Sequence, residues 1–521
     1  MSMDKISILW ADDEIDLLKP HLLYLQDKGF TVKTVTNGND AVDEFGKAPF
    51  DLVFLDENMP GLSGIETLGK IKTLNRNVPI IMITKSEEEA IMDNAIGSQI
   101  SDYLIKPVNP GQILLSIKKN IDKNRLISEK TTSNYQQEFR NISMMLSDNL
   151  SIKEWEDVYK KLVFWELELE KSGDISMKEI LAMQKSEANT LFSKFIEKNY
   201  VNWFNGKNKD MPTMSHNLLK SKVLPDLDKE SQPIFLVVID NLRYDQWKLL
   251  QPVIEEDFKV DKEEMYFAIL PTCTQYARNS LFAGLMPSEI EKMYPGKWQN
   301  DEDEGGKNLH EEEFLGGLLR RAGKDIKFSY NKITNFEAGK RLADNIHSLA
   351  ANNKLNAIVY NFVDTLSHAR TEMEVIRELA SDDAAYRSLT FSWFNHSPLR
   401  DIMRNIRAVG GKLIITTDHG TIKVGEPSKV IGDKNTTTNL RYKQGKSLTY
   451  QAKDVFMLKN PAEAFLPRTH VSSIYLFIKE NKFFAYPNNF NHYVSYYRNT
   501  FQHGGISLEE MIIPFIHLSP K

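Results

Sequence analysis

The sequence predicts an α/β protein built from three successive parts, and three observations lead to this prediction. Short β-rich runs alternate with amphipathic helical stretches near the N-terminus. A stretch of helical periodicity with few glycines or prolines follows, and the C-terminal part again mixes β-rich runs with helices. We therefore expect a parallel-sheet domain at 1–125, a helical bundle linker at 126–210 and a larger α/β domain at 211–521.

Composition limits the classes of function. Hydrophobic residues make up 41% of the 521 residues, enough for packed cores. The net charge of -6, with both signs spread along the chain, argues against a broad basic surface for duplex DNA. The one cysteine, Cys273, excludes an internal disulfide and suits a reducing cytoplasm. The chain begins MSMDKISILWADDE and has no apolar stretch of about 18 residues, so we expect no signal peptide, no membrane span and a cytoplasmic location.

Five βα units are expected in the first domain. The strands are expected at Ile6–Trp10, Thr31–Val35, Leu52–Leu55, Ile80–Ile83 and Asp102–Ile105. Amphipathic stretches such as Ile15–Lys28 and Glu87–Ile96 lie between them. This alternation predicts a parallel sheet with helices on both faces, whose ligands sit beyond the carboxyl ends of the strands.

Polar residues gather at those strand ends. They are Asp12, Asp13, Asp56, Thr84 and Lys106. Carboxylates that meet at one sheet edge repel each other unless a cation binds, and Mg²⁺ is the expected cation because it prefers oxygen ligands. A carboxylate beside Mg²⁺ and a lysine is poised to accept a phosphoryl group, because both cations offset its negative charge.

The motifs DD, FLDENMPG, MIT and YLIKP together resemble the receiver domains of two-component response regulators, which have a flavodoxin-like (βα)5 fold. The resemblance implies that a sensor histidine kinase phosphorylates Asp56 and that phosphorylation produces a homodimer. The implied Mg²⁺ ligands are Asp12, Asp13, Asp56 and the carbonyl of Asn58. The implied switch residues are Thr84, Tyr103 and Lys106.

The middle segment is predicted to be a small helical bundle. Leu150–Leu169 and Ile175–Asn199 show helical periodicity, and Ser151 with Glu154 matches a capping box. The aromatic stripe that includes Trp155 favours a core or a dimer seam over a ligand site. The stretch NGKNKDMP is the expected link to the last domain.

Three β-rich runs of the last domain end in acidic or imidazole side chains: PIFLVVID, NAIVYNFVD and KLIITTDHG. An Asp-x-x-x-His pair shares one face if the chain turns helical, and a late histidine lies in FQHGG. Mixed carboxylate and imidazole ligation suits zinc, and six ligands suit two ions, which can clamp the attacking and leaving oxygens of a phosphoryl transfer. The candidate ligands are Asp240, Asp364, His368, Asp418, His419 and His503.

A nucleophile is expected in ILPTCTQYARNS, where Thr272 and Thr274 precede an apparent helix. Either hydroxyl is a candidate for metal-assisted attack, the other being an N-cap, and the helix amides would favour an anionic phosphate. Arg278 and Asn279, about one turn later, are candidate phosphate contacts.

The ordered set of strand Asp, Thr, Asp-x-x-x-His, Asp-His-Gly and late His-Gly resembles the alkaline phosphatase superfamily, specifically its PglZ-type branch, over about residues 230–520. The resemblance implies two zinc ions bridged by a nucleophilic threonine. The implied ligand sets are Asp364, His368 and His503 for one ion, and Asp240, Asp418 and His419 for the other. The distance to Ala283–Gly284 favours Thr274 slightly, and Thr272 stays open. The sequence around Cys273 does not match the sulfatase Cys-x-Pro-Ser-Arg context.

A receiver followed by helices and a PglZ-type domain resembles the PorX-type regulators, linked to type IX secretion and gliding motility. This resemblance implies a zinc-dependent phosphodiesterase acting on oligonucleotides, linear or cyclic, with a protein transcription regulator as a further partner. The alternative is a phosphorylation-dependent protein-binding regulator whose metal-binding PglZ-type domain is catalytically silent. The absence of a helix-turn-helix or basic stretch disfavours a direct DNA-binding regulator.

Two other features are expected on the surface. The acidic runs Asp301–Glu304 and Glu311–Glu313 are expected to be solvated. Arg441 and Lys443, in NLRYKQG, are expected in a surface loop from which they could reach a phosphate.

Overall fold

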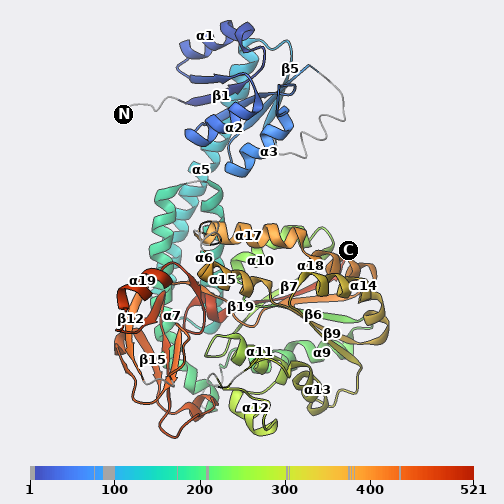
Figure 1. Cartoon of the computed structure of the whole chain (residues 1–521), viewed down its shortest axis with the longest axis vertical. Coiled ribbons are helices and arrows are strands. Elements are labelled where there is room, and N and C mark those ends of the chain that lie inside the picture. The colour runs from blue at the N-terminus through green and yellow to red at the C-terminus, as the bar shows by residue number, and fades with distance from the viewer. Residues whose placement is uncertain are drawn as a thin grey trace. The chain divides into compact units, whose positions relative to one another are not determined.

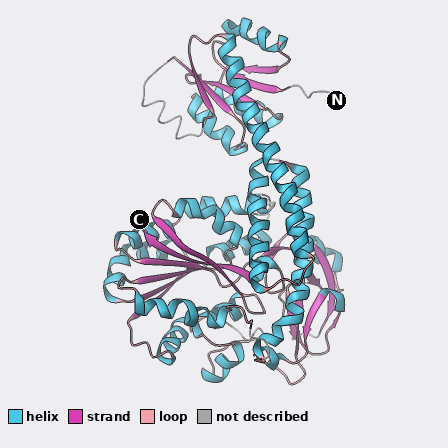
Figure 2. Cartoon of the chain, turned by 180° about the vertical axis from the view of Figure 1, so that it is seen from behind, coloured by secondary structure: helices cyan, strands magenta, loops and turns pink. Residues whose placement is uncertain are grey.

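The computed structural model describes residues 6–75, 77–85, 100–172, 174–206, 210–300, 303, 305–373, 376, 378, 380, 382–432 and 436–521. The chain forms two compact units, seen from opposite sides in Figure 1 and Figure 2. One unit combines Met1–Glu138 with Glu168–Lys178, and the other combines Phe139–Leu167 with Glu179–Lys521. Within the described residues, no helix is both long and apolar enough to cross a membrane.

A five-stranded parallel sheet forms the centre of the first unit, in the order β2-β1-β3-β4-β5. Its strands, each within one residue of the predicted bounds, are β1 (Ser7–Ala11), β2 (Thr31–Val35), β3 (Leu52–Asp56), β4 (Ile80–Thr84) and β5 (Asp102–Ile105). The helices are a 3-10 helix (Ile15–Leu18), α1 (Lys19–Asp27), α2 (Gly38–Lys47) and α3 (Gly64–Leu74). The helix expected at Glu87–Ile96 lies outside the described residues.

Alternate side chains of the strands fill a core on each face of this sheet. On β3, Val53 and Leu55 belong to one core, while Leu52 and Phe54 belong to the other. Burial of both faces explains why the inner strands β1, β3 and β4 are nearly continuous apolar runs, whereas the edge strands β2 and β5 are more exposed. The predicted flavodoxin-like (βα)5 fold is confirmed, and its polar residues are left at the strand ends.

Three long helices follow the receiver sheet along the chain: α5 (Pro110–Leu146), α6 (Ile152–Ser172) and α7 (Ile175–Phe204). The helix α5 runs unbroken through the expected boundary near residue 125. The capping box predicted at the start of α6 is present, since the backbone N–H of Ser151 donates to Oε2 of Glu154 at 2.8 Å. Trp155 is buried with its ring edge-on to Phe192 of α7 at 5.3 Å, so the aromatic stripe contributes to a core.

The second unit contains a six-stranded sheet in the order β7-β19-β10-β6-β9-β8. Its strands are β6 (Ile234–Ile239), β7 (Phe258–Phe267), β8 (Phe328–Ile333), β9 (Leu355–Tyr360), β10 (Lys412–Thr416) and β19 (Ile512–Pro520). The strands β8, β9, β6 and β10 are parallel, whereas β19 is antiparallel to both of its neighbours. Because β6 lies between β9 and β10, the carboxyl ends of these three strands meet at one edge.

Helices cover both faces of this sheet. Figure 1 shows α10 and α18 on one face and α11 and α13 on the other. The helices of this part are α8 (Ser215–Leu218), α9 (Leu224–Lys229), α10 (Tyr244–Ile254), α11 (Thr274–Ala283), α12 (Pro287–Met293), α13 (Glu311–Arg321), α14 (Phe336–Asn352), α15 (Phe362–Glu372), α17 (Asp383–His396) and α18 (Pro398–Ala408).

Short strands between β10 and β19 form a separate group, which Figure 2 shows to one side of the main sheet. They are β11 (Ile422–Lys423), β12 (Glu426–Ile431), β13 (Tyr442–Gly445), β14 (Thr449–Tyr450), β15 (Val455–Leu458), β16 (Ile474–Ile478), β17 (Lys482–Ala485) and β18 (Phe501–Gln502). Two helices, α19 (Phe490–Tyr497) and α20 (Leu508–Met511), complete the region.

The surface position expected for Arg441 and Lys443 is wrong. Both side chains are fully buried in the small-strand group. Arg441 pairs with Glu510 at 2.6 Å, and Nζ of Lys443 donates to the carbonyl of Thr437 at 2.7 Å. These internal partners replace the water that each cation would lose on burial.

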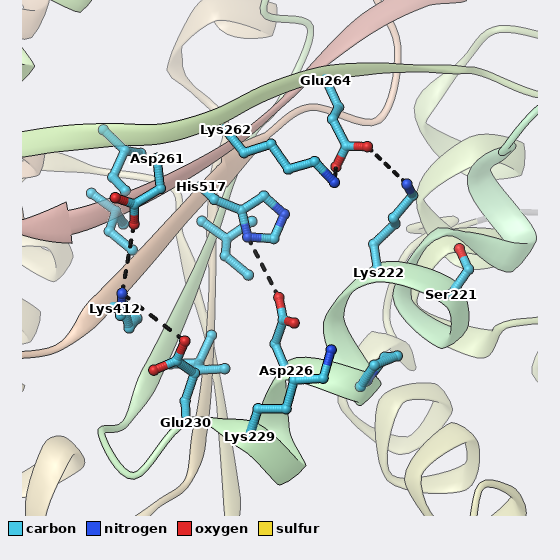
Figure 3. Close-up of a pocket in the computed structure, with 15 residues that line it drawn as sticks. Ser221, Lys222, Asp226, Lys229, Glu230, Asp261, Lys262, Glu264, Lys412 and His517 are labelled. Atoms are coloured by element: carbon cyan, nitrogen blue, oxygen red, sulfur yellow. Dashed lines mark hydrogen bonds and ion pairs between the residues drawn. The ribbon is translucent and has the colours of Figure 1, made fainter.

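A cavity of about 460 Å³ opens at the amino ends of the strands, next to Ile234 and Lys412 (Figure 3). Its charged side chains form pairs within the cavity wall, such as Lys222 with Glu264 at 2.8 Å and His517 with Asp226 at 3.5 Å. This cavity lies at the sheet edge opposite to the carboxyl ends, where ligands of parallel sheets are expected.

Candidate functional site

An acidic cluster lies at the strand ends of the first unit. Carboxylate oxygens of Asp12, Asp13 and Asp56 come within 4.8 Å of one another. Nζ of Lys106, just beyond β5, lies 2.8 Å from Oδ1 of Asp56 and 3.0 Å from Oδ2 of Asp12. The structure therefore brings together four of the residues predicted for magnesium and phosphoryl binding.

The charges in this cluster shift each other's protonation. Burial raises the pKa of Asp56 above its ordinary value, although the neighbouring Lys106 acts in the opposite direction. Burial alone would lower the pKa of Lys106, but its hydrogen bonds to Asp56 and Asp12 outweigh this and raise it. One lysine beside three carboxylates leaves excess negative charge, which suits a divalent cation.

The remaining predicted receiver residues lie around this cluster. The backbone of Asn58 hydrogen bonds to the carboxylate of Asp56, which partly opposes the effect of burial on the pKa of Asp56. The hydroxyl of Thr84 donates to Oε2 of Glu57. Tyr103, the predicted aromatic switch residue, is partly exposed, with 39% of the residue surface accessible.

A second cluster lies at the carboxyl ends of β6 and β10. Asp240 directly follows β6, while Asp418 and His419 follow β10, and ligand atoms of all three lie within 4.8 Å of one another. All three side chains are buried. Thr274, the first residue of α11, has its hydroxyl 3.0 Å from Nε2 of His419 and 3.3 Å from Oδ1 of Asp240.

The other candidate nucleophile, Thr272, has different hydrogen-bond partners. Its hydroxyl donates to the carbonyl of Gly505 at 2.9 Å and accepts from the backbone N–H of Gly504 at 3.1 Å. Thr272 thus fastens the loop that follows His503. The geometry therefore favours Thr274 as the hydroxyl within the cluster.

The predicted ligands of the other ion lie beside the first three. Asp364 is in the first turn of α15, with Oδ1 3.6 Å from Nε2 of His503. The ring of His503 stacks on that of His419 with centroids 4.3 Å apart. His368 follows one turn later in α15, as predicted for an i, i+4 pair, but its side chain lies outside the described residues.

Asn241 links the two ligand sets, and the sequence interpretation missed it. Its backbone N–H donates to Oδ1 of Asp418 at 3.3 Å, and its amide donates to Oδ1 of Asp364 at 3.3 Å. The residue has a φ of 64°, a conformation that asparagine adopts more readily than most side chains. An asparagine directly after a strand-ending aspartate was the available signal.

Burial and mutual repulsion shape the pKa values of the carboxylates. Burial, reinforced by the nearby charge of Asp240, raises the pKa of Asp418 to about 6. Burial opposes ionisation of Asp240 as well, but Arg278 and His419 outweigh it and lower the pKa of that carboxyl. The neighbouring positive charge is thus too small to favour the ionised form of Asp418.

Arg278 and Asn279, which are predicted to contact phosphate, both have hydrogen-bond partners within the protein. The guanidinium of Arg278 is buried against carboxylates, 2.5 Å from Oδ2 of Asp240 and 2.6 Å from Oε1 of Glu311. The amide of Asn279 donates to the carbonyls of Gln275 and Lys307. Arg278 therefore orients Asp240, and Asn279 anchors a neighbouring loop.

Glu311 was expected on a solvated acidic surface, and that expectation is wrong. Its side chain is 1% exposed and accepts hydrogen bonds from Arg278 and the hydroxyl of Tyr330. Its neighbours Glu312 and Glu313 are exposed, in line with the expectation for this run. A run of three glutamates gives no local signal of which member is buried.

Three family models match successive parts of the chain. The model for the response regulator receiver domain matches residues 8–118. The model for the PorX response regulator linker domain matches residues 125–204. The model for the BREX system PglZ alkaline phosphatase-like domain matches residues 218–518, more than half of the chain.

Curated relatives are similar over a shorter stretch. The transcriptional regulatory protein ResD of Bacillus subtilis (strain 168) is 32% identical over 115 residues, which cover 22% of this chain and 48% of ResD. The transcriptional regulatory protein ZraR of Klebsiella oxytoca is 32% identical over 132 residues, which cover 25% of this chain and 30% of ZraR. The chain thus spans less than half the length of either relative.

Solved structures of chemotaxis-type receivers are also similar. The chemotaxis protein CheY4 of Vibrio cholerae is 27% identical, covers 22% of this chain and 98% of its own, and has a TM-score of 0.22. The CheY-like receiver domain protein of Methanospirillum hungatei JF-1 is 25% identical, covers 23% of this chain and 96% of its own, and has a TM-score of 0.23.

Proposed function

This chain belongs to the PglZ alkaline phosphatase-like family in the PorX-type order of receiver, linker and PglZ domain, and we propose that it is a phosphorylation-controlled, zinc-dependent phosphodiesterase. The observation that carries the proposal is the hydroxyl of Thr274, which lies within the cluster of Asp240, Asp418 and His419 at the start of α11. A hydroxyl among metal-ligand side chains at a helix N-terminus suits attack on a phosphate ester.

The residues fit a pair of divalent ions. Oδ2 of Asp418 is buried and accepts no hydrogen bond from the described residues, so an electron pair is available in the cluster. Asp240, Asp418 and His419 would hold one ion, and Asp364 and His503, with His368, would hold the other. Mixed oxygen and nitrogen donors suit zinc, which when bound lowers the pKa of a nearby hydroxyl and offsets charge on phosphate.

The chain's own groups then divide the remaining tasks. The backbone amides in the first turn of α11 favour the anionic phosphate, and Arg278 keeps Asp240 in place. The hydroxyl oxygen of Thr274 bonds to phosphorus, and the bond from phosphorus to the leaving alcohol breaks. The hydroxyl of Thr274 gives up its proton in this step, and the departing alkoxide takes up a proton from solvent, so the two transfers balance. Water then hydrolyses the phosphothreonine ester and restores the hydroxyl.

The receiver supplies control in this proposal. A sensor histidine kinase transfers a phosphoryl group to Asp56, where Lys106 offsets its charge, and Asp12 and Asp13 would hold Mg²⁺, which when bound offsets further negative charge. Phosphorylation adds about 1.5 to 2 negative charges at one point and promotes homodimer formation. The proposed substrates are linear or cyclic oligonucleotides, and the proposed setting is type IX secretion and gliding motility.

Hydrolysis of bis(p-nitrophenyl) phosphate by the zinc-loaded full chain tests the proposal, with Asp418→Ala measured alongside. We expect release of nitrophenol by the wild type and none above background by the variant. If both zinc-loaded proteins are inert toward this ester and toward oligonucleotides, the proposal fails. The alternative is then a protein-binding regulator whose PglZ-type domain keeps its metal-ligand residues but does not catalyse hydrolysis.

A further inference from the structure

The short helix α20 is hydrogen bonded to both loops that carry the metal-ligand histidines. The backbone N–H of Gly420, directly after His419, donates to the carbonyl of Glu510 at 3.2 Å. The backbone N–H of Gly505, two residues after His503, donates to Oε1 of the same glutamate at 2.9 Å. The position of α20 therefore sets the spacing of the two histidine loops.

The approach of α20 to Gly420 leaves no spare room. A Cβ atom at Gly420 would lie 1.9 Å from the carbonyl oxygen of Glu509. A displacement of α20 toward Gly420 would therefore push the backbone next to His419, and a displacement away from Gly420 would break the hydrogen bond of Gly420 to Glu510. With only four residues, α20 has too few internal hydrogen bonds to hold its own position, so its place depends on neighbouring groups.

The linker helix α7 supplies such a group. The side chain of Asn189 is buried, and its Oδ1 accepts from the backbone N–H of Leu508 at 2.8 Å. Its Nδ2 donates to Oε2 of Glu509 at 3.1 Å. One turn earlier, Nζ of Lys185 lies 3.7 Å from Oε1 of Glu509. An amide with two directional bonds fixes α20 more tightly than an apolar contact of the same size.

A second route joins the linker to the strand before His503. Lys185 of α7 pairs with Glu166 of α6 at 2.7 Å, and Glu166 pairs with Arg387 at 3.0 Å. Arg387 lies 2.8 Å from Oδ2 of Asp245, which also binds Arg243. The guanidinium of Arg243 lies over the ring of Phe501, 5.2 Å from its centroid.

We propose that Asn189 is a positioning residue through which the linker helix α7 sets the geometry of His419 and His503, an inference that rests on the proposed function. Residues of α7 up to Lys178 cluster with the receiver unit, and those from Glu179 onward cluster with the other unit. A shift of α7 along its axis reaches the ligand loops through Asn189 and α20. The position of the linker helix thus helps to control the geometry of the site.

The test compares Asn189→Leu with Gln184→Leu, in the full chain. Gln184 is a buried side chain in the same helix and donates to Phe139 and Ser143 of α5 at 3.0 and 3.1 Å, so each variant removes hydrogen bonds made by a buried amide. One readout is the visible absorption of the cobalt(II)-loaded protein, which reports coordination geometry without requiring turnover. The other is the separation of kcat from KM for bis(p-nitrophenyl) phosphate.

We expect Asn189→Leu to alter the cobalt bands and to lower kcat by about tenfold to a hundredfold with little change in KM, because a misplacement of about 1 Å at a reacting centre can cost about a hundredfold. Gln184→Leu should keep the wild-type bands and kcat. Wild-type bands and kcat in Asn189→Leu, or equal changes in both variants, overturn the proposal. If the wild type hydrolyses no ester, the proposed function fails, and the cobalt bands still decide the role of Asn189.

A rescue experiment distinguishes a positioning role of Asn189 from a folding defect in Asn189→Leu. Asn189→Asp keeps an acceptor for Leu508 but places a second negative charge against Glu509. The additional change Glu509→Gln restores a donor and an acceptor with the direction reversed. We expect the single Asp variant to be impaired and the double variant to recover the cobalt bands and kcat. No recovery in a folded double variant counts against the positioning role.

Discussion

The hydroxyl oxygen of Thr274 lies 3.0 Å from Nε2 of His419, whereas the hydroxyl of Thr272, two residues earlier, binds the backbone of Gly504 and Gly505. The two threonines therefore have separable roles. Thr274 belongs to the cluster of Asp240, Asp418 and His419, and Thr272 secures the loop that carries His503.

Thr274→Ala should lower kcat for bis(p-nitrophenyl) phosphate by about a thousandfold or more, because the attacking group is removed. Its melting temperature should stay close to that of the wild type. Thr272→Val should instead lower the unfolding free energy by about 1 to 3 kcal/mol, since buried backbone groups lose their partner, and should keep measurable activity. The reverse assignment of effects would make Thr272 the nucleophile.

Glu510→Ala should destabilise the second unit by about 3 to 5 kcal/mol, because the buried guanidinium of Arg441 loses its carboxylate. Urea-induced unfolding measures the change. Glu313→Ala, which removes an exposed partner of Lys297, is the control and should cost about 1 kcal/mol or less. Equal losses of unfolding free energy in the two variants would show that burial does not increase the contribution of the Arg441–Glu510 ion pair to stability.

His216 should make the protein acid-labile in a defined pH window. Burial lowers the pKa of this imidazole from 6.5 to about 4. The folded protein keeps His216 neutral down to about pH 4, whereas the unfolded chain protonates this imidazole near pH 6.5. The stability that comes from a neutral His216 is therefore fully present above pH 6.5 and is lost as the pH falls to 4. The full difference corresponds to about 3 kcal/mol.

The variant His216→Phe keeps an aromatic ring against Phe204 and removes the titration. The unfolding free energy of the wild type should fall more than that of the variant as the pH is lowered from 7 to 4. His347→Phe, at an exposed histidine, should show no such trend. A flat difference for His216→Phe would show that the buried imidazole does not control acid stability.

Asp56→Asn should abolish labelling by acetyl phosphate, because the acceptor oxygen beside Lys106 is lost. Asp16→Asn, at an exposed acid of the same unit, should label like the wild type. Sedimentation with beryllofluoride and Mg²⁺ should show a dimer for the wild type and a monomer for Asp56→Asn. Labelling that persists in Asp56→Asn would place the phosphoacceptor elsewhere.

The sequence predicts the receiver sheet closely because its inner strands β1, β3 and β4 are apolar runs that end at or next to a polar residue. Val53 and Leu55 face one core while Leu52 and Phe54 face the other, so burial of both faces leaves a strong signal in a single short stretch. Polar residues at the strand ends, such as Asp56 and Asp240, could be recognised in the sequence as candidate site residues because they interrupt these apolar runs.

The partners of buried charges could not be predicted in this way. Arg441 and Glu510 are 69 residues apart, and Arg278 and Glu311 are 33 apart, with no local pattern that pairs them. A charged residue in a polar stretch looks solvated until the fold brings a partner to it. This is why Arg441 and Glu311 were expected on the surface.

The strand order of the large sheet has a consequence for biosynthesis. The strand β19, residues Ile512–Pro520, lies between β10 and β7, so two strands made much earlier cannot be joined until this one has been translated. Until then β7 has no partner in the main sheet, and its hydrogen-bonding edge is open to other chains. We expect the edge of β7 to stay exposed in the nascent chain until β19 has been translated and pairs with it.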